Sequence, residues 1–136
     1  MRVAIHPIVL GVDRCYVIQG EKAIMIDSGA PKQVKAFTKA MESLSLKPED
    51  IKLIVLTHAH WDHIGSAKEI KDITGAKLAL HRLEKDWLET PLPPLPPGVT
   101  AWGRILAKIL AMSMPSVHIP ATNVDIVLGD EDFPLT

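Results

Sequence analysis

Residues 51–66 of this chain read IKLIVLTHAHWDHIGS, an apolar run followed directly by a group of histidine and aspartate side chains. The run over residues 51–56 is nearly continuous in apolar residues, which is typical of a central strand covered on both faces of a sheet. The polar group begins where this strand ends, and the carboxyl end of a strand is the usual place for a site in an α/β sheet. The stretch therefore predicts an α/β protein with a functional site at one edge of its sheet.

The segment before this stretch predicts a hairpin and a helix. Residues 14–19 and 23–27 are short apolar runs separated by Gly20-Glu21-Lys22, which is the pattern of an antiparallel hairpin. Pro31 is well placed as a first helical residue, and apolar side chains then recur at three- and four-residue spacing as far as Leu44. We expect an amphipathic helix that packs on the sheet.

The segment after the motif predicts a second helix and a further strand. Residues 66–74 carry apolar side chains at helical spacing and are followed by Gly75, a residue that often ends helices. Residues 77–81 read as a strand. Strand, helix and strand in this order predict a parallel crossover, which places the motif at the carboxyl end of a sheet strand.

Residues 91–115 interrupt this pattern. Residues 91–98 are rich in proline and predict a stiff, extended connector, and residues 101–114 predict a helix with many large apolar side chains. We interpret the apolar face of this helix as core or interface packing in preference to a substrate-lining lid. A final strand is expected near 124–128. We therefore expect a single domain over residues 1–136, with 91–115 as an insertion within it.

Composition and charge argue against several classes of partner. The 136 residues include 15 basic and 16 acidic side chains with no long run of either sign, so we expect no nucleic-acid partner. No uninterrupted apolar run approaches the ~18 residues of a membrane span, so we expect no membrane partner and a cytoplasmic location. The single cysteine, Cys15, cannot form an internal disulfide, and we interpret it as a small buried hydrophobic residue.

The motif itself has the composition of a metal site. Four of its side chains are of types that normally bind zinc and similar divalent ions: His58, His60, Asp62 and His63. His58 and His60 are two apart beyond a strand, so they can project to the same side of an extended backbone and bind one ion together. The next turn carries Asp62 and His63 toward a second position. Two ions roughly 3.5–4 Å apart can share a hydroxide and polarise a substrate oxygen. We expect two zinc ions, which iron or manganese could replace.

The motif also resembles that of a known family. Residues 56–65 are similar to the His-x-His-x-Asp-His signature of the metallo-β-lactamase-fold superfamily, although Ser66 stands where many members have a second glycine. Residues 26–29, Ile-Asp-Ser-Gly, resemble the strand-ending Asp-x-Gly of the same superfamily. The resemblance extends over nearly the whole chain. It implies an α/β fold that is half of an αβ/βα metallo-β-lactamase-type sandwich, with a mixed sheet flanked by helices.

The resemblance also implies a role for each motif residue. His58 and His60 would ligate the first ion, while Asp62 and His63 would ligate the second. Apart from the resemblance, we also expect Asp62 to act in catalysis by orienting the attacking hydroxide. Asp27 would be a supporting residue near the site, or else a turn aspartate that caps the following helix. Trp61 would line the substrate pocket or have a packing role.

The remaining ligands of the family have no convincing counterpart in this chain. The family completes its two sites with a later histidine in a Gly-His context, a bridging aspartate and a final histidine. We interpret His6, His81 and His118 as ordinary surface or packing histidines. Residues 125–133 resemble the strand and turn that precede the Gly-His segment, so the chain is similar to an N-terminal half. Two ligands per ion are too few for a tight site. We therefore expect ligands from elsewhere, and association with another copy or with a missing C-terminal half.

The leading hypothesis for function is metal-assisted hydrolysis of a small-molecule substrate. A metal-bound hydroxide would attack an ester, thioester, lactone or amide carbonyl, and this chain would be inactive without the missing ligands. Two alternatives stay open at this point. One is a non-catalytic metal-binding or oligomerising half-domain, and the other is an iron-dependent redox member of the same fold.

Overall fold

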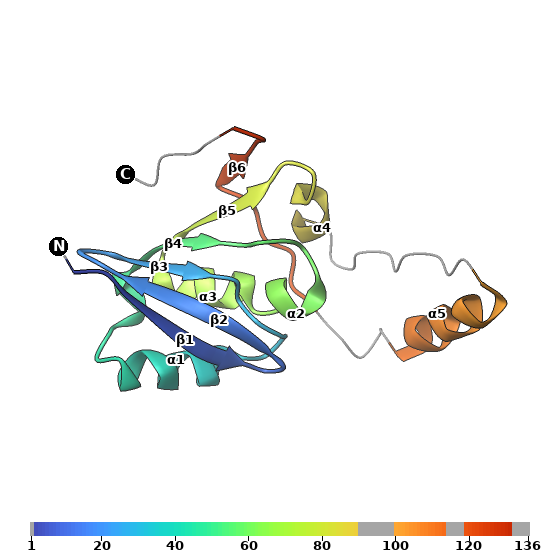
Figure 1. Ribbon diagram of the computed structural model, residues 1–136, viewed down its shortest axis with the longest axis horizontal. Helices are drawn as coiled ribbons and strands as arrows, with labels where there is room; N and C mark the ends of the chain where they lie inside the picture. The colour runs from blue at the N-terminus through green and yellow to red at the C-terminus, as the bar shows by residue number, and fades with distance from the viewer. Residues whose placement is uncertain (1, 90–99, 114–118, 132–136) are drawn as a thin grey trace.

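The computed structural model describes residues 2–89, 100–113 and 119–131, and these contain one mixed six-stranded sheet (Figure 1). The strands lie side by side in chain order: β1 (Ala4–Leu10), β2 (Asp13–Gln19), β3 (Ala23–Ile26), β4 (Ile51–Val55), β5 (Lys77–His81) and β6 (Ile126–Leu128). The first three strands pair antiparallel, and β3 to β6 pair parallel. The α/β fold with a mixed sheet is therefore confirmed.

The helical elements of the described residues are α1 (Val34–Ser43), the 3₁₀ turn η1 (Pro48–Asp50), α2 (Trp61–Ile64), α3 (Ala67–Thr74), α4 (Lys85–Glu89) and α5 (Ala101–Ser113). Of these, α1 and α3 cover one face of the sheet. Phe37 and Met41 of α1 and Ile70 of α3 are fully buried, and they pack against strand residues such as Met25 and Ile54. Alternate residues of each strand point to this face, so the sheet and the helices share one core.

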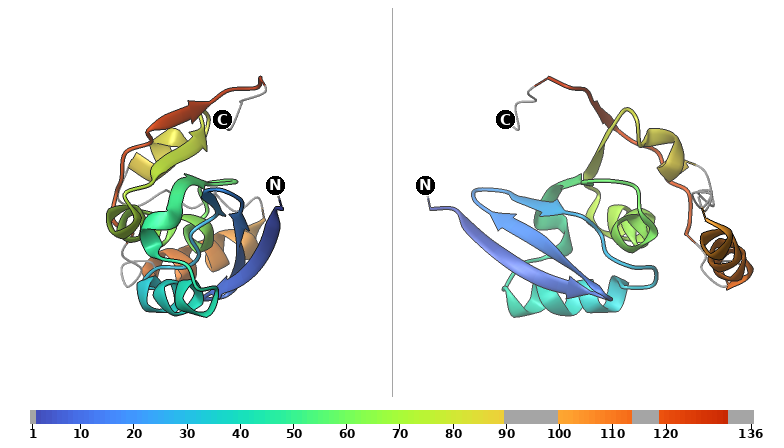
Figure 2. Two further views of the ribbon diagram at one scale, coloured as in Figure 1. Left: turned by 90° about the vertical axis from the view of Figure 1, so that its left-hand side faces the viewer. Right: turned by 45° about the vertical axis from the view of Figure 1, so that its right-hand side comes forward.

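The opposite face of the sheet is less covered than the sequence suggests. Leu53 and Val55 of β4 are half-buried, and Val9 of β1 and Tyr16 of β2 are exposed. The expectation that β4 is covered on both faces is therefore wrong for the described residues. The physical reason is that α1 and α3 both pack on the same face (Figures 1 and 2).

One strand was not expected from the sequence, and one helix begins later than expected. The first strand, β1, begins at Ala4 and includes Pro7. Proline is tolerated there because β1 is an edge strand. Helix α1 begins at Val34 and not at Pro31, since Lys32 has a φ of 62°, which is incompatible with a continuous helix.

The crossover that carries the motif is confirmed. β4 pairs parallel with both β3 and β5, and α3 connects β4 to β5 and ends at Gly75 with a φ of 68°. Because β3 and β4 are parallel, the residues after both strands meet at one edge of the sheet. β2 runs antiparallel to β3, so its first residue, Asp13, lies at this edge as well. We call the side of the sheet where β3 and β4 end the carboxyl edge, and the side where they begin the amino edge.

Helix α5 stands away from the sheet, beyond the end that carries α2 (Figures 1 and 2). Its large side chains Trp102, Ile109 and Met112 are exposed by 73%, 57% and 82%. They are therefore not part of the core, and packing of this helix at an interface stays a prediction. The connector at 91–98 lies outside the described residues. Within the described ranges, no helix is long and apolar enough to cross a membrane.

Candidate metal centre

The motif lies in the segment between β4 and α3, and hydrogen bonds fix its backbone to the segment that follows β3. The amide of Ser28 donates to the carbonyl of His63 at 2.8 Å, and the Ser28 hydroxyl donates to the same carbonyl at 2.6 Å. The amide of Gly65 donates to the carbonyl of Gly29 at 2.9 Å. The segments after two parallel strands are thus joined at the point where the motif ends.

A glycine is required for this close approach. A Cβ at Gly65 would lie 2.2 Å from the backbone nitrogen of Pro31 and 2.4 Å from the carbonyl carbon of Ala30. Ser66, which stands where many members of the family have a second glycine, is fully buried. Its hydroxyl donates to the carbonyl of Ala30 at 2.6 Å and accepts from the amide of Gln33 at 2.9 Å. The serine in place of the family's second glycine therefore adds two hydrogen bonds between the segment after β3 and the end of the motif.

Asp27 orients His63. Oδ2 of Asp27 lies 3.1 Å from Nδ1 of His63, and the aspartate is only 6% exposed. A carboxylate accepts hydrogen bonds, so this contact favours the proton on Nδ1 and leaves the lone pair of Nε2 available. A carboxylate that holds the distant nitrogen of a histidine is the usual second contact of a metal-binding imidazole. The position of Asp27 fits the supporting role expected from the sequence.

Asp27 also reaches the first histidine of the motif through Thr57. The amide of Thr57 donates to Oδ1 of Asp27 at 2.8 Å, and the threonine hydroxyl lies 2.9 Å from each oxygen of the same carboxylate. The hydroxyl oxygen is 2.9 Å from Nδ1 of His58. If the hydroxyl donates to Asp27, it can accept from Nδ1–H of His58, and Nε2 of His58 is then available as a ligand.

The three histidine rings of the motif lie together. The ring centroids of His58 and His60 are 4.5 Å apart, and those of His58 and His63 are 4.1 Å apart. Between the first two histidines, the amide of Ala59 donates to Oε2 of Glu84 at 3.1 Å, which connects the motif to the segment after β5. The structure therefore brings both expected ligand pairs to one place.

A carboxylate that the sequence did not single out completes this group. Oδ2 of Asp13 lies 3.6 Å from Nε2 of His63, and Oδ2 of Asp62 lies 3.7 Å from the same nitrogen. One ligand atom from each of these three side chains falls within 4.8 Å of the others. Oδ2 of Asp13 is buried and accepts no hydrogen bond among the described residues. A donor set of one imidazole and two carboxylates with an unsatisfied oxygen fits a divalent cation.

The two carboxylates influence each other's protonation. The pKa of Asp13 is raised, first by the close approach of the Asp62 side chain, then by burial and by the charge of Asp62. Burial acts to raise the pKa of Asp62, but the Asp13 side chain and the nearby histidines outweigh it, so the pKa of Asp62 is lowered.

The neighbouring Cys15 is not part of this chemistry. It is fully buried in the core of the sheet, and burial raises the pKa of its thiol to about 12. A thiol with so high a pKa carries almost no thiolate near neutral pH. The interpretation of Cys15 as a small buried hydrophobic residue is confirmed.

The other histidines make ordinary contacts. His6 on β1 lies 3.0 Å from the side-chain oxygen of Gln19 on β2, and His81 lies 3.0 Å from a carboxylate oxygen of Asp130. His118 falls outside the described residues. Trp61 begins α2 and is 41% exposed, so it is not a core residue, and its role at a substrate pocket stays a prediction.

Sequence reasoning missed the contacts that position the motif. Asp13 and Glu84 come from segments far from the motif in sequence, and Thr57 directly precedes His58, but its side chain was given no role. A signal existed for Asp13, because the predicted antiparallel hairpin puts residue 13 beside the end of the strand that carries Asp27. Glu84 offered no such signal, since its position depends on the path of the chain after β5.

Taken together, the parallel crossover and the group of imidazole and carboxylate side chains at the carboxyl edge define a class, the α/β proteins with a metal-binding motif after a central strand. The comparisons identify the family within this class. The model of the metallo-beta-lactamase superfamily matches residues 10–134. The chain belongs to the metallo-beta-lactamase superfamily.

Similar proteins share the name of metal-dependent hydrolase. A UPF0173 metal-dependent hydrolase of Thermococcus onnurineus is 33% identical over 109 residues, which cover 78% of this chain and 43% of that protein. A UPF0173 metal-dependent hydrolase of Pyrococcus abyssi is 45% identical over 69 residues, covering 46% and 26%. The chain therefore spans less than half the length of these relatives.

Solved structures support the fold. The subclass B3 metallo-beta-lactamase BJP-1 of Bradyrhizobium japonicum matches with a TM-score of 0.67 and 30% identity, over 93% of this chain and 40% of that protein. The class B3 di-zinc metallo-beta-lactamase LRA-12 from an Alaskan soil metagenome matches with a TM-score of 0.66 and 24% identity, over 88% and 40%. The second likeness shows the fold alone.

Proposed function

We propose that this chain provides the metal-binding half of a hydrolase whose ions are held by the motif after β4. The observation that supports it best is the position of His63, whose Nδ1 contacts Asp27 while its Nε2 faces Asp13 and Asp62. A histidine held in this way is ready to bind a cation through Nε2. The names of the relatives agree with a hydrolase.

Each motif residue has a proposed role. His58 and His60 bind one ion, and Asp62 and His63 bind the second. We propose zinc for both ions, since nitrogen and oxygen donors suit it, although the same donors also accept iron or manganese. When bound, such ions supply a nucleophilic water at neutral pH and polarise the substrate carbonyl.

The remaining chemistry depends on side chains of this chain. Asp62 is the proposed catalytic residue, because its carboxylate can also orient the attacking water. Asp27 acts as a positioning residue through His63 and Thr57. Trp61, which is 41% exposed beside the motif, offers an apolar surface to the substrate. The proposed substrates are small molecules with an ester, thioester, lactone or amide carbonyl.

Full activity is proposed to need more than these residues. The first ion has two expected ligands in this chain, whereas a catalytic zinc site usually has three protein ligands and a water. The relatives are more than twice as long as the part that this chain matches. We propose that further ligands come from a C-terminal continuation or from a second copy. The cytoplasmic location and the absence of nucleic-acid and membrane partners stay predictions.

Metal content and hydrolysis, measured side by side on the zinc-equilibrated chain, test this proposal. The variants His60→Ala and Asp62→Ala should each lose bound zinc, and any hydrolysis of a carbonyl-substrate panel should disappear with it. His6→Ala is the matched control, since His6 contacts Gln19 on the first hairpin, and it should keep both properties. Full zinc content and hydrolysis in both motif variants would contradict the proposal.

The open face of the sheet favours a second proposal, namely association. Apolar residues of neighbouring strands share this face and are exposed or half-buried in the described structure: Val9, Tyr16, Ile24, Ile26, Leu53 and Val55. A contiguous apolar face of this kind usually packs against another layer. Size-exclusion chromatography with light scattering tests this, and a clean monomer at micromolar concentration would count against self-association.

A further inference from the structure

We propose that Asp13 is a third protein ligand of the second ion, so that the hairpin between β1 and β2 takes part in the metal site. This inference rests on the proposed function, because it assumes that Asp62 and His63 bind that ion. It adds a ligand from the N-terminal hairpin, far in sequence from the motif, and supplies a donor that the motif alone lacks.

The geometry of the three side chains fits one tetrahedral ion. Nε2 of His63 lies 3.6 Å from Oδ2 of Asp13 and 3.7 Å from Oδ2 of Asp62. Donors bound to one tetrahedral zinc at about 2.0–2.2 Å lie roughly 3.3–3.6 Å from each other. Small side-chain rotations would therefore suffice to bring all three donors to bonding distance of a common ion.

The surroundings of Asp13 fit a ligand better than a turn residue. Its Oδ2 is buried and has no hydrogen-bond partner among the described residues, where a surface turn aspartate would be solvated or bonded to its own backbone. A buried oxygen without a partner is destabilising, and a bound cation would remove this cost. Nε2 of His63, itself a proposed ligand atom, lies 3.6 Å from this oxygen.

The turn that carries Asp13 is held in place by the segment that follows β3. The amide of Ala30 donates to the carbonyl of Leu10, the last residue of β1, at 3.0 Å. Gly11 has a φ of 87°, and a Cβ there would lie 2.7 Å from the Cβ of Ala30. The segment 28–30 thus contacts both the hairpin turn and the motif, so the positions of Asp13 and His63 are fixed by the same backbone.

The two ions are then expected to differ in their number of protein ligands and therefore in affinity. With Asp13, the second ion has three protein ligands and an open position, which is the usual arrangement of a catalytic zinc site. The first ion keeps His58 and His60. The chain should therefore bind its second ion more tightly than its first, and the first equivalent of metal should occupy the site of Asp13, Asp62 and His63.

Zinc titration with a chromophoric competitor, combined with elemental analysis, tests the role of Asp13. Asp13→Asn should weaken the tighter of the two binding steps at least about tenfold, since even indirect partners of a ligand change affinity 10–100-fold. Glu42→Gln on the exposed side of α1 removes the same charge and should leave both steps unchanged. Far-UV circular dichroism checks that each variant is folded.

The outcomes separate this inference from the proposed function. If Asp62→Ala keeps the tighter step, the proposed metal site is wrong. If Asp62→Ala loses that step while folded Asp13→Asn keeps it, the site stands and the role of Asp13 is wrong.

A gain of signal provides a test that does not depend on loss of binding. The variant Asp13→Cys, loaded with Co²⁺, should show a thiolate-to-cobalt charge-transfer band, because a thiolate at position 13 would bind the ion directly. The unchanged chain has only the buried Cys15 and should show no such band. Absence of the band in a folded, cobalt-loaded variant would overturn the inference.

Discussion

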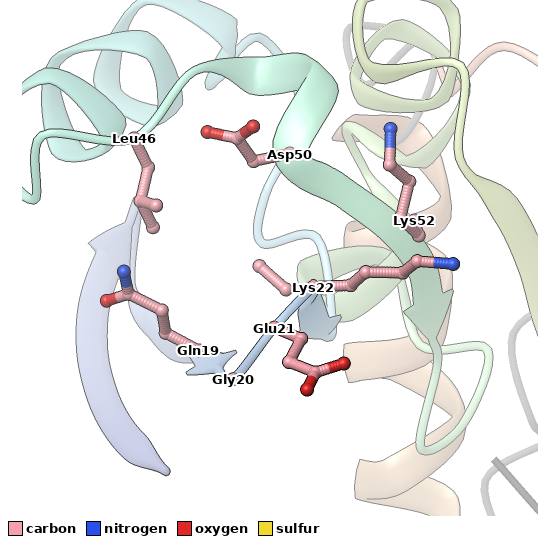
Figure 3. A pocket seen from close by; sticks show the side chains of 8 residues that line it. Gln19, Gly20, Glu21, Lys22, Leu46, Asp50 and Lys52 are labelled. Carbon is pink, nitrogen blue, oxygen red and sulfur yellow. The ribbon is translucent and has the colours of Figure 1, made fainter. Parts of the chain in front are cut away.

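The two edges of the sheet differ in what their polar groups contact. At the amino edge, where β3 and β4 begin, a cavity of about 260 Å³ is lined by Gln19, Glu21, Lys22, Asp50 and Lys52 among others. These side chains point in different directions (Figure 3), and Asp50 and Lys52 contact backbone groups of η1 and its N-cap at 2.8 and 2.6 Å. At the carboxyl edge, the polar side chains converge on one another.

This difference distinguishes an ordinary surface cavity from a metal site. The charged side chains at the amino edge have opposite signs, and Asp50 and Lys52 contact nearby backbone groups, so the cavity offers no group of metal-ligand atoms directed at one point. At the carboxyl edge, Asp27 is buried and contacts both Thr57 and His63, while Asp13 and Asp62 face the free nitrogen of His63. Imidazole and carboxylate groups that converge on one point and are oriented by a buried partner are the better indication of metal chemistry.

The largest effect is expected from Gly65→Ala at the carboxyl edge. The added methyl group would collide with the backbone of Ala30 and Pro31. This backbone cannot move away without breaking the hydrogen bond from the amide of Gly65 to the carbonyl of Gly29. We expect a loss of about 3 kcal/mol in the free energy of unfolding, measured by urea denaturation. Gly129→Ala is the control, because no atom lies within 4 Å of its added Cβ. Equal stabilities of the two variants would show that the close approach does not matter.

Asp27→Asn should have the next largest effect, on metal binding. The amide can no longer accept hydrogen bonds with both of its polar atoms, so the orientation of His63 and of Thr57 is weakened together. We expect zinc affinity to fall about 10–100-fold in both binding steps, measured by competition titration. Asp50→Asn makes the same chemical change at the amino edge and should leave zinc affinity unaltered. A similar loss in both variants would remove the distinction between the two edges.

Glu84→Gln should produce a smaller and more selective effect. Its carboxylate accepts from the amide of Ala59, which lies between His58 and His60. A neutral acceptor weakens this hydrogen bond without removing it, so zinc affinity in the weaker step should fall by roughly 2–10-fold, less than for partners that contact a ligand directly. The step assigned to Asp62 and His63 should not change in the same titration. Loss of that step instead would mean that Glu84 stabilises the whole segment.

Asp125→Asn should change stability slightly and leave metal binding intact. Its Oδ2 accepts from the amide of Leu78 and lies 2.8 Å from Nζ of Lys71, which ties the start of β6 to β5 and α3. Burial acts to raise its pKa, but the Lys71 and Leu78 contacts outweigh this and lower the pKa from 3.8. Because the pKa of Asp125 is lower in the folded chain than in the unfolded chain, its carboxylate stabilises the fold at pH values above the unfolded-state pKa. This stabilisation is lost as the pH falls through the folded-state pKa.

We expect Asp125→Asn to cost about 1 kcal/mol near neutral pH, measured by urea unfolding, because the charged acceptor is lost. The difference from the unchanged chain should shrink as the pH is lowered below 3.8. A difference that grows with acidity would contradict the assignment.

Much of the fold could be predicted from local patterns. The hairpin of β2 and β3, the crossover through α3 and the location of the motif after β4 follow from apolar periodicity and from glycine at the end of a helix. These are effects within a few residues. The pattern for β1 was also present, since Ile8 and Leu10 are buried while Ile5 and Val9 are exposed. His6 and Pro7 obscured it, although an edge strand accommodates proline.

The parts that could not be predicted depend on distant contacts. The start of α1 is delayed to Val34 because the backbone near Gly29 and Ala30 bonds to Gly65 and Leu10. The motif residues could be named from their type and spacing. The residues that orient them could not, because strand pairing and the chain path after β5 bring them together.

Anomalous X-ray diffraction at the zinc edge, from crystals of this chain equilibrated with zinc, tests the metal site itself. The structure predicts a strong peak among Asp13, Asp62 and His63 and a weaker one beside His58 and His60, with no comparable peak in the cavity at the amino edge. Zinc peaks away from both motif pairs, in a crystal where the motif is free of lattice contacts, would contradict the proposed metal centre.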